Sequence, residues 1–491
     1  MLQQVMVFYT NPDQVSKMAV AFRSSIALGI FIIFFVVCYY KLFWKVEGAK
    51  RIFWISSTIL AVVMLIKFSI GVLYKGYVPE LLLFYGIPSP KAQSLGWWLV
   101  AVSVVMLFLY YREKIEAWPT RKFLPVIFIT FSLLIFSVAA IREGKASVAD
   151  PYTKIFWEYS GNVSHIRDLK VFLHNYIVNE LPPLTIAKHS ETHPPGYTVI
   201  LYMLSKLFSV GFLGMAVLTI IISATVVWPL YYLWRELLPE LAVRRALEIF
   251  IFVPSIVLMI ATSTEGFFLL LVWTAVSLCL IGWKKNIWLA GLGGISAAMA
   301  VFSNFLFLLL APFFLYLVWR VLHEAMFTSR LRMLTRIFVS LLSFSVFFVA
   351  LYQWSGYSIV DNFYTARVGD ALAVRSNFES LRMYLLYFFM NMSTFLFYSG
   401  IPLAYLILKN FRHTLQSKLW LFNSGLVLIV FFLLIGIFQG NVERLWLFMV
   451  PFFVVFFHSF FTEKGTKLLT PFLVLLLLQV VVTEILFYTF Y

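Results

Sequence analysis

The chain contains a long series of apolar runs, most of them close to the length that crosses a membrane. A helix needs about 20 apolar residues to cross the hydrocarbon core of a bilayer. The runs that approach this length lie at 25–43, 53–74, 96–111, 124–141, 211–234, 246–264, 266–283, 286–303, 304–322, 337–356, 384–408, 419–438, 445–462 and 468–488. The sequence therefore predicts an all-α, polytopic membrane protein with about 14 transmembrane helices.

Composition supports the same class of protein. The chain is 62% hydrophobic and only 12% charged, whereas soluble domains are about half apolar and about a quarter charged. A formal net charge of +16 is also found in nucleic-acid-binding proteins. Here, however, the basic residues fall in short loops between apolar runs, which is typical of membrane topology. We therefore expect membrane lipids as surroundings and no nucleic-acid partner.

The distribution of basic loops predicts which loops share a side of the membrane. Basic residues gather in alternate loops, and the positive-inside rule makes that side cytoplasmic. The opposite side receives the segments 142–195, 356–382 and 439–444. The short apolar segment 197–208 is expected to lie half-buried at the surface, because a full crossing there would invert every later loop. The chain is thus predicted to be a multi-pass protein of the cell membrane with its unusual loops outside.

The segment 142–195 is the most polar part of this apolar chain. A connection between two helices needs only a few polar residues. This segment holds four of the seven histidines, His165, His174, His189 and His193, and six carboxylates, Glu143, Asp150, Glu158, Asp168, Glu180 and Glu191. Its length and chemistry predict a large extracytoplasmic loop that carries an active site.

Two acids in this loop are candidates for a general base. Asp150 is followed by Pro151 and Tyr152, and Glu158 stands between Trp157 and Tyr159. A carboxylate among apolar and aromatic groups can have its pKa raised until it accepts a proton near neutrality. The alternative is an ordinary loop acid or helix N-cap, since Asp before Pro is common in turns and caps. Both interpretations stay open for each acid.

The loop ends in the sequence His-Pro-Pro-Gly at 193–196. Two prolines fix a corner of the chain, and proline favours the first turn of a helix. One interpretation is simply a corner before a helix. The other is that His193, with Lys188 and His189 nearby, presents hydrogen-bond donors to an anionic ligand at the membrane surface.

Glu443 and Arg444 open a late apolar run on the same predicted side. Arginine at a membrane boundary often extends its charged end toward water. Here it stands beside an acid and at a helix start, where the helix dipole favours anions. Its planar fork fits two phosphate oxygens, so a phosphate site is the second interpretation. Glu265 and Lys67 are further charges in apolar runs, which makes them functional candidates by default, although each can also lie at the interface or reach it.

Together these motifs resemble the GT-C superfamily of integral-membrane glycosyltransferases, in particular bacterial members related to protein mannosyltransferases and aminoarabinose transferases. The residues that carry the resemblance are 150–152, 193–196, 254–265 and 441–448. The resemblance covers about 124–491, with the loop 142–195 as the first catalytic loop of a GT-C fold. Residues 1–123 then form an N-terminal extension of three helices that has no assigned role.

The resemblance implies a reaction and its participants. Such enzymes transfer a sugar from a polyprenyl-phosphate donor to an acceptor hydroxyl of a lipid, glycan or protein at the outer face, in assembly of the cell envelope. A loop carboxylate serves as the base, with Asp150 as first choice and Glu158 as second. The family usually shows two acids or an acid–aromatic cluster at this site, and here Asp150 is followed only later by Glu158, which leaves that choice open. The donor phosphate would be held by Arg444, His193, Glu443, His189 and Lys188, with Glu443 orienting Arg444.

No cofactor is required by any motif in the sequence. Nothing demands a metal, although the loop acids are able to hold a divalent cation. Two alternatives from other classes stay open. A transporter of lipid-linked sugars or solutes would show inverted repeats and polar sites near the membrane midplane, and no repeat is visible. A scaffold of the GT-C type that binds a lipid carrier without chemistry is not distinguished by sequence.

Overall fold

The computed structural model describes residues 29, 33, 36–37, 39–44, 46–74, 86–177, 187–324, 326–373, 377–409, 419–457 and 466–488. The described residues are almost entirely helical, and their only sheet pairs two short strands. These strands are β1 (Ile87–Pro88) and β2 (Phe487–Tyr488), which run antiparallel. The predicted all-α class is confirmed.

The first part of the chain and the large loop contain the π-helix η1 (Tyr39–Phe43) and the helices α3 (Glu47–Tyr74), α4 (Leu95–Glu116), α5 (Thr120–Ala139), α6 (Lys145–Thr153), α7 (Ser160–Val163), α8 (Leu169–His174), η3 (Lys188–Thr192) and α10 (Gly196–Phe208). The middle contains α11 (Phe212–Ala224), α12 (Val227–Arg235), α13 (Glu240–Phe250), α14 (Pro254–Thr262), α15 (Glu265–Lys285), α16 (Ile287–Ser303), η4 (Phe305–Leu310), α17 (Ala311–Glu324) and α18 (Phe327–Ser355). The last part contains α19 (Ile359–Ala373), η5 (Asn377–Glu379), α20 (Leu381–Ser399), α21 (Ile401–Lys409), α23 (Trp420–Leu434), α24 (Val442–Leu445), η6 (Leu447–Met449), α25 (Val450–Val454), η7 (Val455–Phe457) and α27 (Thr466–Leu486).

Several of these helices are long and apolar enough to cross a membrane. Among the described residues there are seven, and nine if the bent pairs α13–α14 and α20–α21 each count as one span. The expected runs at 286–303, 419–438 and 445–462 form shorter apolar helices. The run at 25–43 lies mostly outside the described residues. The multi-pass class therefore stands, with direct support for up to nine of the roughly fourteen expected spans.

Side-chain caps explain why α16 is shorter than a full span. Asn286 precedes it and accepts a hydrogen bond from the backbone N–H of Trp288. Asn304 follows it and accepts one from Leu306, which starts the 3-10 helix η4. Asparagine is a preferred residue at such positions because its side chain satisfies an otherwise unpaired backbone group.

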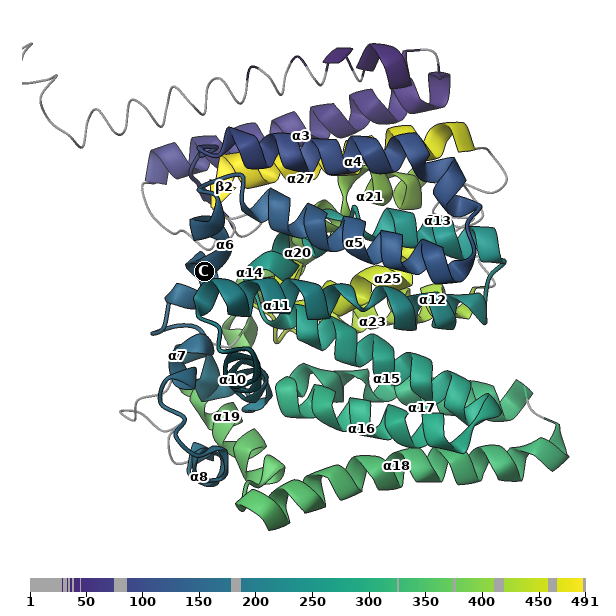
Figure 1. The fold of residues 1–491 in the computed structure, drawn as a ribbon. Coiled ribbons are helices and arrows are strands. Elements are labelled where there is room, and N and C mark those ends of the chain that lie inside the picture. The colour runs from purple at the N-terminus through teal and green to yellow at the C-terminus, as the bar shows by residue number, and fades with distance from the viewer. Residues whose placement is uncertain are drawn as a thin grey trace, which may run out of the picture.

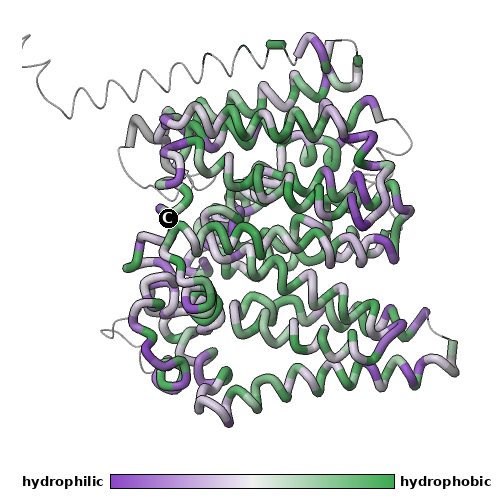
Figure 2. Tube along the Cα trace, in the orientation of Figure 1, coloured by the Kyte–Doolittle hydropathy of each residue, from purple (hydrophilic) through white to green (hydrophobic). Residues whose placement is uncertain are grey.

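The long helices run side by side in layers (Figure 1). Helices α3, α4 and α27 lie at one edge of the bundle, and α18 lies at the opposite edge. Hydrophobic residues fill the middle of the long helices, while hydrophilic ones gather toward their two ends (Figure 2). Most side chains of α18 are exposed although the helix is apolar, as expected of a surface that faces lipid.

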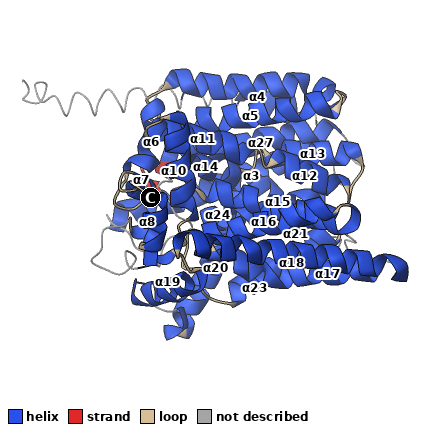
Figure 3. Cartoon of the chain, turned by 60° about the horizontal axis from the view of Figure 1, so that its bottom comes forward, coloured by secondary structure: helices blue, strands red, loops and turns tan. Residues whose placement is uncertain are grey.

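Small helices collect at one end of the bundle. Helices α6, α7, α8, α10 and α19 share this end in Figure 1, and the turned view in Figure 3 keeps α7, α8 and α19 there. The His174 Nδ1 atom lies 3.2 Å from the Ser355 carbonyl oxygen, and the rings of Tyr176 and Tyr357 are in edge contact. The prediction that the segments 142–195 and 356–382 share one side is therefore confirmed.

Helix α10 meets the bundle at this end in a different direction. Figure 1 looks along its axis, whereas α11, α15 and α16 run across the picture. With 13 residues it is a short apolar helix and is not among the candidate spans. Its position at the membrane surface stays a prediction.

A buried charge network fastens the N-terminal part to the bundle at the other end. Arg112 of α4 pairs with Glu116, and its Nη1 lies 3.5 Å from Oε2 of Glu248 on α13. Arg245 of α13 lies 3.4 Å from Glu116. All four side chains are buried, and buried charges are kept only where they are paired. The network thus joins α4 to α13.

Candidate functional site

The corner at 193–196 is seated against the end of α16. A Cβ atom on Gly196 would lie 2.3 Å from the Phe302 carbonyl oxygen, so only glycine fits this close approach. The hydroxyl of Tyr176 donates to the His193 carbonyl oxygen over 2.9 Å. These contacts fix the start of α10 and bring Tyr197 beside the Asn304 side chain.

The segment before this corner is docked on the first half of the loop. Asn162 accepts a hydrogen bond from the Ala187 N–H and donates one to the Ser190 hydroxyl, each over 2.7 Å. The docking carries His189 to the buried Glu158, whose Oε1 lies 3.3 Å from the imidazole Nδ1. The two ends of the loop therefore meet.

Arg444 reaches this meeting point from α24. Its Nε lies 3.4 Å from Oε1 of Glu265, the first residue of α15. Burial acts to lower the pKa of Arg444, but Glu265 and Glu158 outweigh burial and hold the pKa above its usual value. Arg444 is therefore a permanent, largely buried cation between two acids.

Several buried polar atoms around Arg444 have no hydrogen-bond partner in the described part of the chain. They include Oγ1 of Thr264, Oε1 of Glu158, Oε2 of Glu443 and Nε of Arg444. Of these, Glu158 Oε1 has an ion pair with His189, and Arg444 Nε has one with Glu265. An unsatisfied buried polar group costs about 1–3 kcal/mol, so such atoms are rare in folded proteins. Four such atoms in one place indicate a site that a polar ligand completes.

Two groups in this region carry less charge than the sequence suggests. Burial and the neighbouring His189 lower the pKa of His193 to about 4, so its imidazole is neutral at neutral pH. Its Nδ1 lies 2.8 Å from the His189 carbonyl oxygen and donates to it in the neutral form. Burial raises the pKa of Glu443 to about 7, against the influence of Arg444 and Lys67. Near neutrality Glu443 is therefore divided between its neutral and charged forms.

Asp150 lies on a more open side of the same end. It belongs to α6, and its side chain is 38% exposed. The Tyr488 hydroxyl donates a hydrogen bond to Asp150 Oδ2, and the Lys154 ammonium lies 3.8 Å from the same oxygen. Lys154 also interacts electrostatically with Glu158. Lys154 thus connects the Asp150 side with the Arg444 side.

The structure brings together most of the residues that the sequence singled out. Glu158, His189, His193, Glu443 and Arg444 lie around one polar cluster, since each interacts with another member. Asp150 borders it through Lys154, as described above.

Lys188 is the exception. Its ammonium pairs with Glu191 over 2.6 Å, and its side chain is 43% exposed. Glu180, one of the six loop acids, lies outside the described residues.

Sequence reasoning missed partners that come from distant parts of the chain. Glu265 carried a signal, because it is a charge in an apolar run, but its pairing with Arg444 is visible only in the fold. Tyr159 packs edge-on against His193 and Tyr197. Tyr488 follows the last apolar run, and no local pattern marks it as a partner of Asp150.

The described residues contain no group of three or more His, Cys, Asp or Glu side chains placed to hold a metal ion. In this region cationic and hydrogen-bonding side chains come together instead. The chemistry that they can perform is the binding of an anion and the transfer of a proton.

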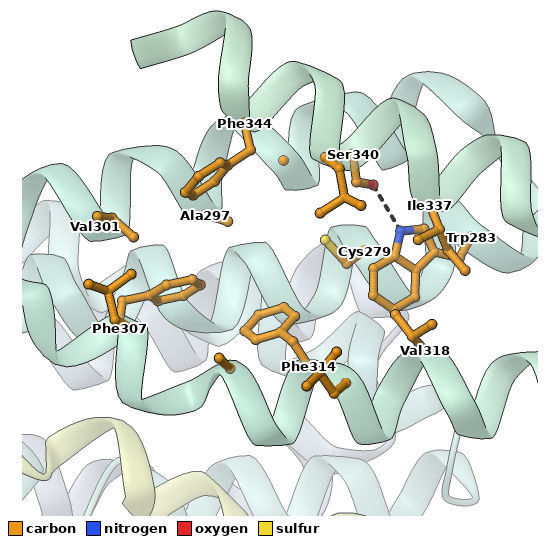
Figure 4. Close-up of a pocket in the computed structure, with 15 residues that line it drawn as sticks. Cys279, Trp283, Ala297, Val301, Phe307, Phe314, Val318, Ile337, Ser340 and Phe344 are labelled. Carbon is orange, nitrogen blue, oxygen red and sulfur yellow. Dashed lines mark hydrogen bonds between the residues drawn. The ribbon is translucent and has the colours of Figure 1, made fainter. Parts of the chain in front are cut away.

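An apolar cavity of about 430 Å³ opens between α15, α16, η4, α17 and α18 (Figure 4). Phe307, Phe314 and Phe344 point into it. The indole N–H of Trp283 donates to the Ser340 hydroxyl over 2.8 Å, so these polar groups are satisfied within the wall. Val301 and Phe307 also line the cavity, and both stand three residues from Asn304 beside Tyr197. Part of the cavity wall therefore lies within a few residues of Asn304, the hydrogen-bond partner of Tyr197.

Comparison with known families gives one match. The model of the dolichyl-phosphate-mannose-protein mannosyltransferase family, which belongs to the GT-C superfamily, matches residues 192–349. This is about a third of the chain, from the His193 corner into the last turns of α18, and it includes Glu265 and the apolar cavity. None of the curated proteins compared with the chain matches it. The family match confirms the resemblance to the GT-C superfamily and supports a membrane glycosyltransferase of this type.

Proposed function

We propose that the protein transfers a sugar from a polyprenyl-phosphate donor to an acceptor hydroxyl at the membrane surface. The acceptor hydroxyl gives its proton to Asp150, and its oxygen attacks the anomeric carbon of the donor sugar. The bond between that carbon and the phosphate oxygen breaks. Polyprenyl phosphate leaves with the bonding electrons, and Arg444 stabilises its added negative charge.

The observation that carries this proposal is the unsatisfied polar surface around Arg444. The guanidinium is largely buried and always charged, yet its Nε has no hydrogen-bond acceptor among the described residues. Thr264, next to Glu265, also has an unpaired hydroxyl there. The oxygens of a phosphate can accept hydrogen bonds from both the guanidinium N–H groups and the Thr264 hydroxyl. Arginine binds phosphate through two parallel hydrogen bonds.

The surroundings of the two candidate acids favour Asp150 as the base. Glu158 is buried beside His189 and Arg444, on the side of the cluster that the donor phosphate would occupy. Asp150 is partly exposed and lies to the side of the cationic cluster. An acceptor can therefore reach Asp150 while the donor phosphate occupies the Arg444 side.

The apolar cavity supports a donor that carries a hydrocarbon chain. It is lined almost wholly by apolar side chains of α15 to α18, and Val301 and Phe307 of its wall flank Asn304, the hydrogen-bond partner of Tyr197. A polyprenyl chain attached to a phosphate at Arg444 has to leave the polar cluster through an apolar surface. The cavity offers such a surface inside the bundle.

We further propose that this end of the bundle faces outward in the plasma membrane. The opposite end carries Lys285, Arg320 and Arg336 beside acidic or carbonyl partners, and positive loops favour the cytoplasm. Cysteines at Lys145 and Glu379, both exposed, should react with an impermeant thiol reagent in intact cells. A cysteine at Lys285 should not react. Labelling of Lys285 alone would reverse the orientation.

Transfer by the purified protein tests the function. In lipid nanodiscs, the full chain should consume synthetic polyprenyl-phosphate mannose when a membrane lipid and glycan extract supplies acceptors. Polyprenyl phosphates bearing another hexose or aminoarabinose test which sugar is used. Release of polyprenyl phosphate without any glycosylated product, whichever donor is supplied, would contradict transfer.

The alternatives predict different results in the same preparation. A binding scaffold holds the donors at equilibrium but never releases polyprenyl phosphate. A transporter moves intact donor across a sealed vesicle without breaking the sugar–phosphate bond. Either result, with no glycosylated product from any donor, would exclude the proposed reaction.

A further inference from the structure

The end of the chain reaches the candidate base, 338 residues away in sequence. The hydroxyl of Tyr488 donates a hydrogen bond to Oδ2 of Asp150. The Lys154 ammonium in turn donates to the Tyr488 hydroxyl oxygen and lies 4.6 Å from the centre of its ring. The three side chains form a series of donors that ends at the Asp150 carboxylate.

Arg142 holds the strand that carries Tyr488. Its Nη1 donates to the carbonyl oxygens of Glu484 and Phe487 over 2.9 and 2.8 Å. Its Nη2 donates to the carbonyl oxygen of Ser89 over 3.0 Å. Its guanidinium also lies over the Tyr488 ring at 5.5 Å. A buried guanidinium must be fully partnered, so these bonds fix the place of β2.

The N-terminal extension completes this attachment. In the sheet, Ile87 of β1 pairs with Tyr488 of β2. A few residues later, the Gln93 N–H donates to the Arg142 carbonyl oxygen over 2.9 Å. The segment 87–93 is therefore bonded both to the strand that carries Tyr488 and to the start of the loop that carries Asp150.

The protonation of Tyr488 gives the hydrogen bond its direction. Burial, and the hydrogen bond to Asp150, raise the pKa of Tyr488 above its usual value. The phenol therefore stays protonated at neutral pH. Its hydroxyl hydrogen is therefore available to Asp150 Oδ2, while Lys154 donates to its oxygen.

We propose that Tyr488 is a positioning residue for Asp150, and that the segment 87–93 holds Tyr488 in place. This rests on the proposed function, in which Asp150 accepts the proton of the acceptor hydroxyl. The Tyr488 bond occupies Oδ2 and fixes the rotation of the carboxylate, which directs Oδ1 at the acceptor. The extension before residue 124 thereby gains a role in the site.

The first test is Tyr488→Phe, measured with synthetic polyprenyl-phosphate mannose and a membrane extract as acceptor source. Phenylalanine keeps the ring that Arg142 and Lys154 contact and removes the hydroxyl, which donates to Asp150 and accepts from Lys154. One charge-assisted hydrogen bond corresponds to about a tenfold change. We expect kcat to fall about tenfold, with an unchanged KM for the donor and an unchanged melting temperature.

Tyr384→Phe is the matched control. Its hydroxyl donates to the Leu434 carbonyl oxygen over 2.9 Å and not to a residue of the loop that carries Asp150. The control loses the same kind of bond and should keep the wild-type kcat. An equal loss of kcat in both variants would mean that Tyr488 contributes only to stability and would overturn the proposal.

Lys154→Met provides a second variant that leaves β2 intact. It removes the donor to Tyr488 and should lower kcat by a smaller factor at unchanged KM. If Tyr488→Phe does not fold, a wild-type kcat in Lys154→Met overturns the proposal and a lowered kcat at constant KM supports it.

A double variant separates this proposal from the proposed function. Tyr488→Phe should cause no further loss in an Asp150→Asn background, because the carboxylate that it positions is gone. A full further loss would show that Tyr488 acts independently of Asp150. If Asp150→Asn alone keeps normal turnover, Asp150 is not the base and the proposed function itself is wrong in that assignment. If Asp150→Asn is inactive but Tyr488→Phe is fully active, only the positioning role is wrong.

Discussion

The two sides of the polar cluster differ in how completely their polar groups are satisfied. On the Arg444 side, the atoms Arg444 Nε, Glu443 Oε2 and Thr264 Oγ1 are buried without hydrogen-bond partners among the described residues. On the Asp150 side, Tyr488 and Lys154 supply donors to a carboxylate that is partly open to solvent. One side is incomplete inside the protein, and the other is held by the protein itself.

This difference suits the two sides to different tasks, ligand binding on the Arg444 side and proton transfer on the Asp150 side. Unsatisfied buried groups reduce stability, and they are kept where a ligand supplies the missing partners. A group that must accept a proton in a fixed direction gains from being held before the ligand arrives. In the proposed reaction, the Arg444 side would hold the donor phosphate and the Asp150 side would supply the base.

The largest expected effect is that of Asp150→Asn. The amide keeps the shape and the bond from Tyr488 but cannot take a proton, and a general base contributes about 10²–10⁴-fold. Initial rates of mannose transfer should fall by roughly that factor, while donor affinity should stay close to wild type.

Asp168→Asn is the control for that change. Asp168 is in the same loop and caps α8 through the N–H groups of Lys170 and Val171, a role that asparagine performs equally well. It should keep normal rates. If Asp150→Asn stays active and Glu158→Gln does not, the base is Glu158, and the two sides exchange roles.

Arg444→Ala should have the next largest effect, on donor affinity. A charge-assisted bond to phosphate is worth roughly 1.5–3 kcal/mol, which corresponds to about one to two orders of magnitude in Kd. Arg444→Lys should restore only part of the affinity, because an ammonium keeps the charge without the planar fork. Equilibrium binding of polyprenyl-phosphate mannose to folded protein measures both variants.

Arg336→Ala serves as the control for a lost arginine. Arg336 donates to the Lys284 carbonyl oxygen at the other end of the bundle, and its loss should leave donor affinity unchanged. If lysine replaces Arg444 fully and alanine reduces only stability, Arg444 is an anchor at the membrane surface and not a phosphate ligand.

The sequence predicted the Arg444 side better than the Asp150 side, for a physical reason. Charges inside apolar runs stand out, so Glu265, Glu443 and Arg444 could be selected without a structure. Only the pairing of Glu265 with Arg444 required the fold.

Contacts between residues that are far apart in the sequence leave no comparable local pattern in the sequence. Tyr488 is one of 25 tyrosines, and its bond to Asp150 depends on the pairing of β1 with β2. Burial also changes charge in ways that residue type does not show. His193 has a pKa of about 4 because it is buried beside His189, so its type alone suggested a cation that is absent at neutral pH.

A smaller effect is expected from pH on the Arg444 side. The pKa of Glu443 is about 7 because of burial. As pH rises from 6 to 8, Glu443 becomes negative and repels the donor phosphate, which is already an anion throughout this range. A like charge of this kind costs about 1 kcal/mol, or roughly fivefold in affinity. The Kd for polyprenyl-phosphate mannose should therefore increase about fivefold across this interval.

The smallest expected effect is the pH dependence that remains in Glu443→Gln. Glutamine is neutral at every pH, so affinity should be constant between pH 6 and 8 and close to the acidic value of the wild type. If His193 were a cation, it would lose its positive charge as pH rises, and the loss of that attraction to the phosphate would also weaken binding. Its pKa of about 4 places that loss of charge below the measured range.

One outcome would contradict this assignment. If donor affinity still decreases with rising pH in Glu443→Gln, and this decrease disappears when His193→Asn is added, His193 is a cation in the complex and belongs with Arg444 as a ligand of the phosphate. A flat profile leaves Arg444 as the permanent charge on this side, with His193 acting through its neutral ring.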